Sequence, residues 1–165
     1  KKFITYPRTG SKYIPEDLWP EIPVLVRTLE VRASCKEAVG KVKWGRFNKR
    51  IVNDVKVTDH HGLLITEKSP SALSAKEDAV YDMIALRLLE ALSHTCSKEI
   101  TDIVLQVLHY DFALKGCKIL KPGWRAIRGN FTGEDNEPVQ ELPELQVGDK
   151  LKIKEAAILE KKTKK

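Results

Sequence analysis

The first thirty residues carry apolar side chains at helical spacing. Pro15 is suited to start a helix, whereas Pro20 and Pro23 prevent a single unbroken one. We therefore predict a turn over residues 15–19 and a helix over residues 21–30. The apolar face of this region consists of residues three or four positions apart, which are Leu18, Ile22, Leu25, Val26 and Leu29.

Two serine-containing stretches predict the starts of further helices. "SCKE" at residues 34–37 and "SAKE" at residues 74–77 both have the form of a capping box, in which serine and glutamate bind each other's backbone amides. The first predicts a short helix that ends near Gly40. The second predicts a long amphipathic helix over residues 75–93, with an apolar stripe at Val80, Tyr81, Ile84, Leu88 and Leu92.

The pattern changes from helical to strand-like near residue 98. Residues 101–120 are rich in Val, Ile, Leu and aromatics, which predicts at least two strands that are interrupted at residues 109–111 and at Gly116. Later, a Gly-Asp turn leads into alternating apolar residues that begin with Leu151 and Ile153.

These elements predict an α+β chain with two parts. The helical part covers residues 1–97 and the β-rich part covers residues 98–165. We also predict loops over residues 44–54 and over the acidic stretch 130–141. No internal repeat or glycine-rich phosphate-binding loop is visible in the sequence.

Composition fits a soluble globular protein. Of the 165 residues, 42% are hydrophobic and 32% are charged, and no apolar run approaches the roughly 20 residues that span a bilayer. The first residues lack the apolar region of a secretory signal, so we expect a cytoplasmic protein. The chain starts abruptly and without Met, which suggests an excerpt from a longer protein.

Charge and cysteines add little to the functional picture. The formal net charge is +6, but four lysines lie in the last five residues, and the rest is nearly balanced. Charge alone is therefore weak support for a nucleic-acid partner. Cys35, Cys96 and Cys117 are far apart and have no metal-site spacing, so we expect reduced thiols.

The stretch "FITYPRTGS", residues 3–11, holds the first candidate for chemistry. A lone tyrosine usually packs, but Pro7 favours an extended Tyr6, so that Tyr6 and Arg8 project from one side of the chain. A phenol with a pKa of about 10 is a poor nucleophile unless a partner stabilises the developing charge. A guanidinium can hold two phosphate oxygens, so this pair favours phosphoryl transfer.

The stretch "VTDHHGLLIT", residues 57–66, is the second candidate. It places His60 and His61 directly after Asp59, between the early helices and the long one. Neighbouring histidines are common on surfaces, and their spacing does not suggest a metal site. Alone, this stretch gives no firm assignment.

In this order, the two stretches resemble the tyrosine-bearing region of type IA DNA topoisomerases, in particular the bacterial topoisomerase III branch. "TYPRT" at residues 5–9 matches the family's Thr-Tyr-x-Arg-Thr string, and residues 60–66 match its downstream histidine motif. The resemblance continues through the long helix, "GW" at residues 123–124 and "LPELQVGDKLKI" at residues 142–153. Gly10 and Ile65 depart from the family, which often has Asp and Pro there.

The resemblance implies roles for individual residues. Tyr6 would attack a DNA phosphodiester to form a 5′-phosphotyrosyl bond, Arg8 would stabilise the transition-state charge, and His60 would orient the scissile phosphate. Thr9, Ser11 and His61 are candidate DNA contacts; they complete the set of site residues.

The resemblance also implies a fold and a cofactor. The helical part would be a helix-turn-helix domain like that of catabolite activators, followed by part of the β-rich arch domain. Mg²⁺ would be held in the parent protein by a toprim domain outside this chain, with no metal or cofactor ligands within it. The chain alone is therefore expected to be inactive. The implied partner is a single-stranded segment of supercoiled or interlinked DNA, with no membrane and no ATP requirement.

Three alternatives are open at this stage. The helices could form a non-enzymatic helix-turn-helix DNA-binding module in which Tyr6 only packs. A tyrosine recombinase also forms phosphotyrosyl DNA, but its tyrosine follows its arginines and histidines, whereas here it comes first. The third alternative is a structural fragment with a basic tail and no site.

Overall fold

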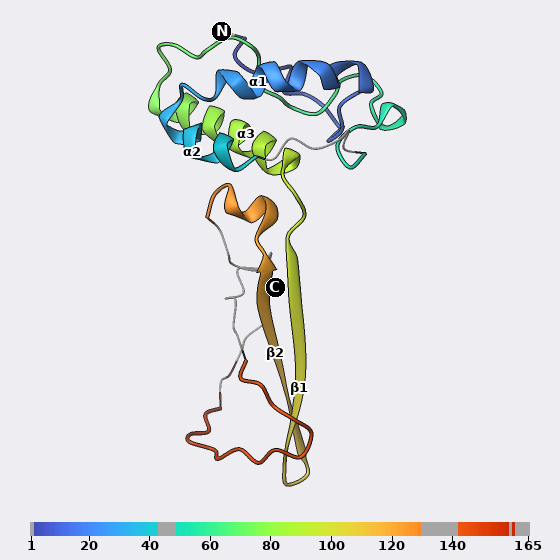
Figure 1. Ribbon diagram of the computed structural model, residues 1–165, viewed down its shortest axis with the longest axis vertical. Helices are drawn as coiled ribbons and strands as arrows, with labels where there is room; N and C mark the ends of the chain where they lie inside the picture. Colours follow the sequence, from blue (N-terminus) through green and yellow to red (C-terminus); the bar gives the residue numbers. More distant parts are fainter. Residues whose placement is uncertain (1, 43–48, 130–141, 159, 161–165) are drawn as a thin grey trace.

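The chain forms a helical body from which a long two-stranded hairpin extends (Figure 1). The computed structural model describes residues 2–42, 49–129, 142–158 and 160. The predicted loop at residues 130–141 lies outside this range, and so does most of the first half of the loop predicted at residues 44–54.

The helical body follows the predicted sequence of short helices and one long helix. A 3-10 turn precedes the first helix, as expected from the prolines, and a second short turn precedes the long helix. In chain order these elements are η1 (Glu16–Glu21), α1 (Ile22–Thr28), α2 (Ala33–Lys41), η2 (Asp54–Lys56) and α3 (Ala75–Leu92).

One hydrophobic core holds these helices together. The predicted apolar face of the first region is confirmed: four of its five residues are buried, and Leu18 packs against them. The stripe on α3 is only partly as predicted, because Val80 is exposed while Ala85 and Leu89 are fully buried. The buried face of α3 is therefore centred on the side of Ala85 and Leu89, and Val80 lies outside its edge.

The two predicted capping boxes have different outcomes. At α3, the Glu77 amide donates to Ser74 Oγ and the Ser74 amide donates to Glu77 Oε2, so this box is confirmed. At α2, the box is absent, because the helix begins at Ala33 and Ser34 already lies inside it. The Ser34 hydroxyl instead donates to Asp82 on α3, at 2.9 Å.

An arginine ties α2 to α3. Arg32 binds Asp82 through Nε and Asp78 through Nη2, and its guanidinium lies 4.9 Å from the centre of the Tyr81 ring. Burial works against the charge of Arg32, but hydrogen bonds and attraction from Asp82 and Asp78 raise its pKa above the ordinary value. This residue therefore stays charged inside a partly buried contact.

The hairpin consists of β1 (Ser97–Val107) and β2 (Tyr110–Lys121), paired antiparallel. The predicted turn near residue 109 is confirmed, with Leu108 in the left-handed region at φ 57°. The predicted interruption at Gly116 is wrong: Gly116 lies opposite Thr101, and β2 continues past it. A single glycine does not end a strand whose neighbours on both sides are paired.

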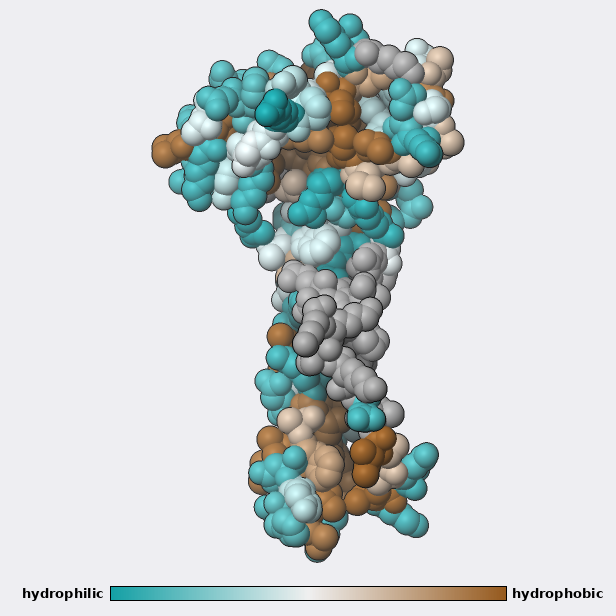
Figure 2. Space-filling view, turned by 180° about the vertical axis from the view of Figure 1, so that it is seen from behind, coloured by the Kyte–Doolittle hydropathy of each residue, from teal (hydrophilic) through white to brown (hydrophobic). Residues whose placement is uncertain are grey.

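One face of the hairpin is apolar towards its tip. The cross-strand pairs Ile103–Leu114, Leu105–Phe112 and Val107–Tyr110 share this face. Apolar side chains gather at this far end of the molecule (Figure 2). Phe112 and Tyr110 remain exposed there.

The described residues 142–158 contain a turn but no strand. The Gly148-Asp149 turn is confirmed, because the Asp149 amide donates to the Gln146 carbonyl at 3.1 Å. The apolar alternation that begins with Leu151 and Ile153 does not form a paired strand, and both side chains are exposed. Alternation alone does not form a strand when no neighbouring strand accepts its hydrogen bonds.

The hairpin returns to the helical body through η3 (Gly123–Ala126). Gly123 has φ 53°, and the Trp124 amide donates to the His94 carbonyl at 2.8 Å. Beyond η3, Ile127 is buried in the helical core, and Arg128 pairs with the buried Glu90 at 2.6 Å. The change from helix to sheet falls near residue 98 as predicted, and the domain boundary there stays a prediction.

None of the helices in the described parts of the chain is long and apolar enough to span a membrane.

The return of the hairpin predicts a large effect for Gly123→Ala. An added Cβ would lie 2.3 Å from the Thr95 carbonyl oxygen, in addition to the strain of the left-handed backbone. We expect a loss of about 3 kcal/mol or more in the free energy of unfolding, measured by urea denaturation. Gly129→Ala is the matched control: it also has a positive φ but an open surrounding, so about 1 kcal/mol is expected. Equal losses in the two variants would contradict the close approach at Gly123.

The Arg32 contact predicts a second stability effect. Arg32→Met leaves Asp82 and Asp78 without their cation, so the free energy of unfolding should fall by about 1–3 kcal/mol. Arg27→Met is the control, because Arg27 is exposed on α1 and forms no ion pair among the described residues; it should change stability by less than about 0.5 kcal/mol. An Arg32 variant as stable as the control would show that the two carboxylates do not need this cation.

Candidate active site

The two sequence motifs lie side by side because the backbone segments that carry them are hydrogen-bonded. The Thr5 amide donates to the Leu64 carbonyl at 2.8 Å, and the Thr66 amide donates to the Phe3 carbonyl at 3.0 Å. Between them, Ile4 and Ile65 form an antiparallel bridge, with Ile65 buried in the core. This pairing joins segments about sixty residues apart. The departure at Ile65 therefore falls on a core residue of this pairing.

A second anchor follows the tyrosine motif. The Ile14 amide donates to Ile51, and the Asn53 amide donates back to Ile14, in a parallel bridge to Val52. Ile14 and Val52 are both buried. The residues between the two anchors, 6–13, thus form a loop whose two ends are fixed on the core.

Tyr6 and His60 contact each other at the exposed end of this pairing. Their ring centres are 4.7 Å apart and the rings are tilted by 48°. Tyr6 is 56% exposed, so more than half of this residue's surface is open to solvent. The tyrosine is therefore neither a core residue nor isolated, because a histidine lies directly against it.

Thr9 and Ser11 maintain the shape of the loop. Thr9 Oγ1 donates to the His60 carbonyl at 2.9 Å and accepts from the Ser11 amide at 3.0 Å. Ser11 Oγ donates to the Lys56 carbonyl at 2.8 Å. Each hydroxyl therefore already donates its hydrogen to the protein backbone, and a DNA contact by Thr9 or Ser11 stays a prediction.

His61 differs from its neighbour. Its Nδ1 lies 2.7 Å from the Gly62 carbonyl oxygen, and because a carbonyl only accepts, Nδ1 carries the hydrogen. Its side chain is half-buried, whereas His60 is exposed. Gly62 itself approaches the backbone closely, since an added Cβ would lie 3.1 Å from the Lys12 carbonyl carbon.

Arg8 is exposed and has no hydrogen-bond or ion-pair partner among the described residues. The backbone bends at Pro7, so residues 6–8 are not a regular extended segment. That Tyr6 and Arg8 project from one side of the chain therefore stays a prediction. Gly10 has open space where a side chain would extend. Replacing an acidic residue by glycine at this position therefore leaves no packing defect.

Further residues that support this loop were not predicted from the sequence. Asn53 caps η2 by accepting from the Lys56 amide at 3.2 Å, and the Lys56 ammonium group reaches the Tyr13 hydroxyl at 3.4 Å. An Asn-Asp pair ahead of a short turn was a usable signal for the cap. Nothing in the sequence pattern linked Lys56 to Tyr13, which is more than forty positions away.

The described residues do not bring together three or more His, Cys, Asp or Glu side chains that could hold a metal ion. These residues therefore do not fit a magnesium site by themselves. We assign no chemical step to a metal held by them.

Comparison with known proteins agrees with the motif-based resemblance. A family model described as DNA topoisomerase matches residues 1–165. The chain is 35% identical over 159 residues to DNA topoisomerase 3 of Bacillus licheniformis, which covers 93% of this chain. It is 34% identical to DNA topoisomerase 3 of Bacillus subtilis over 93% of the chain, and of Shouchella clausii over 98%.

In each of these three relatives, the match spans only 22% of the relative's own length. The predicted resemblance to the topoisomerase III branch of the type IA enzymes is confirmed, whereas the helix-turn-helix assignment stays a prediction. Since the family match covers every residue, this chain belongs to the DNA topoisomerase family.

Proposed function

We propose that this chain is the tyrosine-bearing part of an ATP-independent type IA DNA topoisomerase. In this proposal the enzyme cleaves one DNA strand through Tyr6, passes another strand through the break and reseals it. The single observation that carries the proposal is the contact between the exposed Tyr6 and His60, which the two family motifs supply from distant positions.

The proposed cleavage step is an in-line displacement at phosphorus. Tyr6 Oη bonds to the scissile phosphorus and loses its proton, while the bond from phosphorus to the 3′-oxygen breaks. That oxygen takes up a proton and leaves as a 3′-hydroxyl, and the downstream strand stays on Tyr6 through its 5′-phosphate. Because the phosphotyrosyl bond replaces one phosphodiester by another, the reverse attack reseals the strand without ATP.

Arg8 and His60 have separate roles in this proposal. Arg8 has no protein partner among the described residues, so its guanidinium is available for the non-bridging phosphate oxygens as negative charge builds up. His60 stays against the Tyr6 ring because Thr9 holds the His60 backbone carbonyl. It would orient the tyrosine and the scissile phosphate, while Thr9 acts as a positioning residue.

The partner and conditions follow from the same proposal. DNA would enter as a single strand, as the family resemblance implies. A toprim domain of the longer parent would supply Mg²⁺, so the isolated chain should form no covalent adduct. We further propose a cytoplasmic location, where the DNA is accessible.

Tyr6→Phe is the direct test, made in the full-length parent protein that the sequence predicts. After incubation with Mg²⁺ and a single-stranded oligonucleotide and then denaturation, the wild type should carry the 3′-labelled part of the strand and release the 5′-labelled part. Tyr6→Phe should form no adduct, because the attacking oxygen is missing. Tyr110→Phe, an exposed tyrosine on the hairpin, is the control and should form the adduct normally.

An adduct formed by the Tyr6→Phe variant would rule out Tyr6 as the nucleophile. If instead neither the wild type nor the Tyr6→Phe variant formed an adduct and both bound DNA equally well, the non-enzymatic helix-turn-helix module would be the better description.

His60→Ala tests the histidine. It should slow adduct formation by roughly 100-fold, as expected for losing one group that orients and stabilises a transition state. His109→Ala is a matched control, because His109 also lies against a tyrosine, with its ring centre 4.2 Å from that of Tyr110, but at the hairpin tip. Equal rates for the two variants in single-turnover cleavage would remove His60 from the mechanism.

A further inference from the structure

Two lysines and a tyrosine form a positively charged cluster beside the candidate active site. Lys56 Nζ lies 5.0 Å from the centre of the Tyr13 ring and 3.4 Å from its hydroxyl oxygen. Lys12 Nζ lies 5.6 Å from the same ring centre. Two cations therefore share one phenol. We call Lys12, Tyr13 and Lys56 the lysine–tyrosine cluster.

No carboxylate among the described residues forms an ion pair with the lysines of this cluster. Asp54, two residues from Lys56, instead accepts from the Glu16 amide at 2.7 Å. Both lysines are exposed, so their charge is open to an anionic ligand.

The cluster stands on fixed backbone. The Tyr13 amide donates to Ser11 Oγ at 3.1 Å, and its carbonyl accepts from the Gly62 amide at 2.7 Å. The Lys56 amide is held by the Asn53 cap. Only the lysine side chains themselves remain to be ordered when a ligand binds, which limits the entropy cost.

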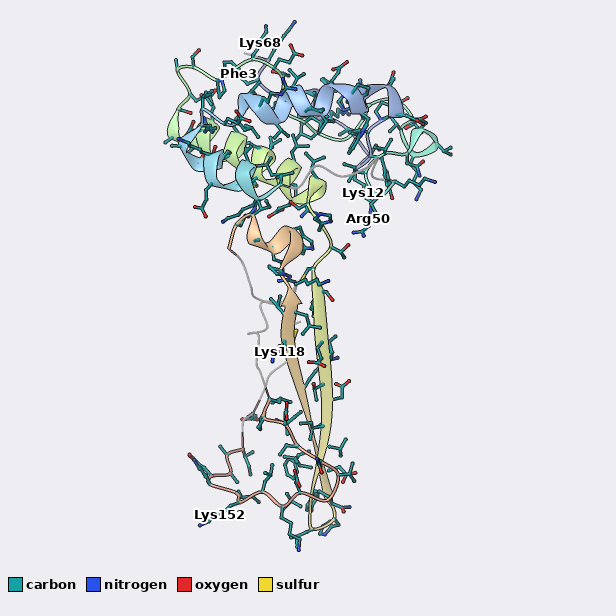
Figure 3. The ribbon with its side chains drawn as sticks, in the orientation of Figure 1. Phe3, Lys12, Arg50, Lys68, Lys118 and Lys152 are labelled. Carbon is teal, nitrogen blue, oxygen red and sulfur yellow. The ribbon has the colours of Figure 1, made fainter. Side chains whose placement is uncertain are left out.

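Hydrogen bonds connect the cluster to the catalytic histidine. The Lys56 carbonyl accepts from Ser11 Oγ, the Ser11 amide donates to Thr9 Oγ1, and Thr9 Oγ1 donates to the His60 carbonyl. These three consecutive bonds join the backbone that carries the cluster to the backbone of His60, which contacts Tyr6. Figure 3 shows Lys12 on the helical body, far from Lys118 on the hairpin and from Lys152.

We propose that the lysine–tyrosine cluster binds a backbone phosphate of the DNA strand, beside the phosphate that Tyr6 attacks. An ammonium group only donates, so Lys56 leaves the Tyr13 hydroxyl hydrogen available for a phosphate oxygen. The two lysines supply the charge, and Tyr13 fixes where they lie. The proposal rests on the proposed function, because it takes the same strand as its ligand.

The test is the salt dependence of non-covalent binding. This chain is titrated against an unstructured single-stranded oligonucleotide of about twelve nucleotides, with fluorescence anisotropy as the readout. Because the two lysines neutralise one phosphate between them, Lys12→Gln with Lys56→Gln should reduce the slope of log affinity against log salt by about 0.7. Because such contacts vanish near 1 M salt, this slope corresponds to about 5-fold weaker binding at 0.1 M.

Two controls define the outcome. Lys118→Gln with Lys152→Gln removes the same charge from exposed positions away from the site and should keep the wild-type slope. Lys12→Arg with Lys56→Arg keeps the charge and should also keep the slope, which separates phosphate contact from a folding defect. An unchanged slope in the glutamine pair, an equal loss in the Lys118 and Lys152 pair, or no binding by the wild type would overturn the proposal.

The outcome is independent of the covalent chemistry. If Tyr6→Phe abolishes the adduct while the glutamine pair keeps the wild-type slope, the proposed phosphate contact is wrong and the proposed nucleophile stands. If the slope falls as expected but the adduct persists in Tyr6→Phe, the contact stands and the proposed nucleophile is wrong.

Discussion

The candidate site depends on one backbone pairing, in which residues 3–5 are hydrogen-bonded to residues 64–66. Neither segment has enough length to be a stable strand alone, but Ile65 is buried in the core between the helices, so the pairing is part of the fold and not an addition to it. The tyrosine motif and the histidine motif meet because each continues directly from this pairing. If it opened, Tyr6 and His60 would separate although no helix had changed.

A second constraint fixes how the hairpin leaves and rejoins the helical body. Gly123 allows the close approach to the Thr95 carbonyl, and Ile127 then enters the core that α3 helps to form. The buried Glu90 forms ion pairs with both Arg87 and Arg128, so its charge is compensated by two cations. A two-stranded ribbon is marginal by itself, and its base is here stabilised by the helices. At its apolar tip, Tyr110 and Phe112 stay exposed.

Local signals in the sequence predicted most of the elements but not their contacts. Three of these signals act over only a few residues: the early prolines, the Ser74 capping box and the change to Val and Ile. The element that each of the three predicts exists. Ser34 was misassigned because its hydroxyl binds Asp82, a residue that only the packing of α2 on α3 brings near. Gly116 was misassigned because pairing with Thr101 outweighs the weak strand preference of glycine. The contact of Tyr6 with His60 could be expected only from the resemblance, since no local rule links positions so far apart.

The arrangement separates the residues that stabilise the fold from those available for chemistry. Ile14 at one end of the tyrosine loop is buried, and so is Ile65, which pairs with Ile4 at the other end, whereas Tyr6, Arg8 and His60 are exposed. Burying the guanidinium of Arg8 or the phenol of Tyr6 would cost desolvation energy in the free protein, and the structure avoids this cost. The loop is instead held by Thr9 and Ser11, whose hydroxyls bind only backbone carbonyls and amides of the protein. Side-chain substitutions at the exposed positions therefore leave these backbone contacts in place. Small polar residues therefore set the shape of the loop that carries Tyr6, the proposed nucleophile, while the exposed Arg8 takes no part in holding that loop.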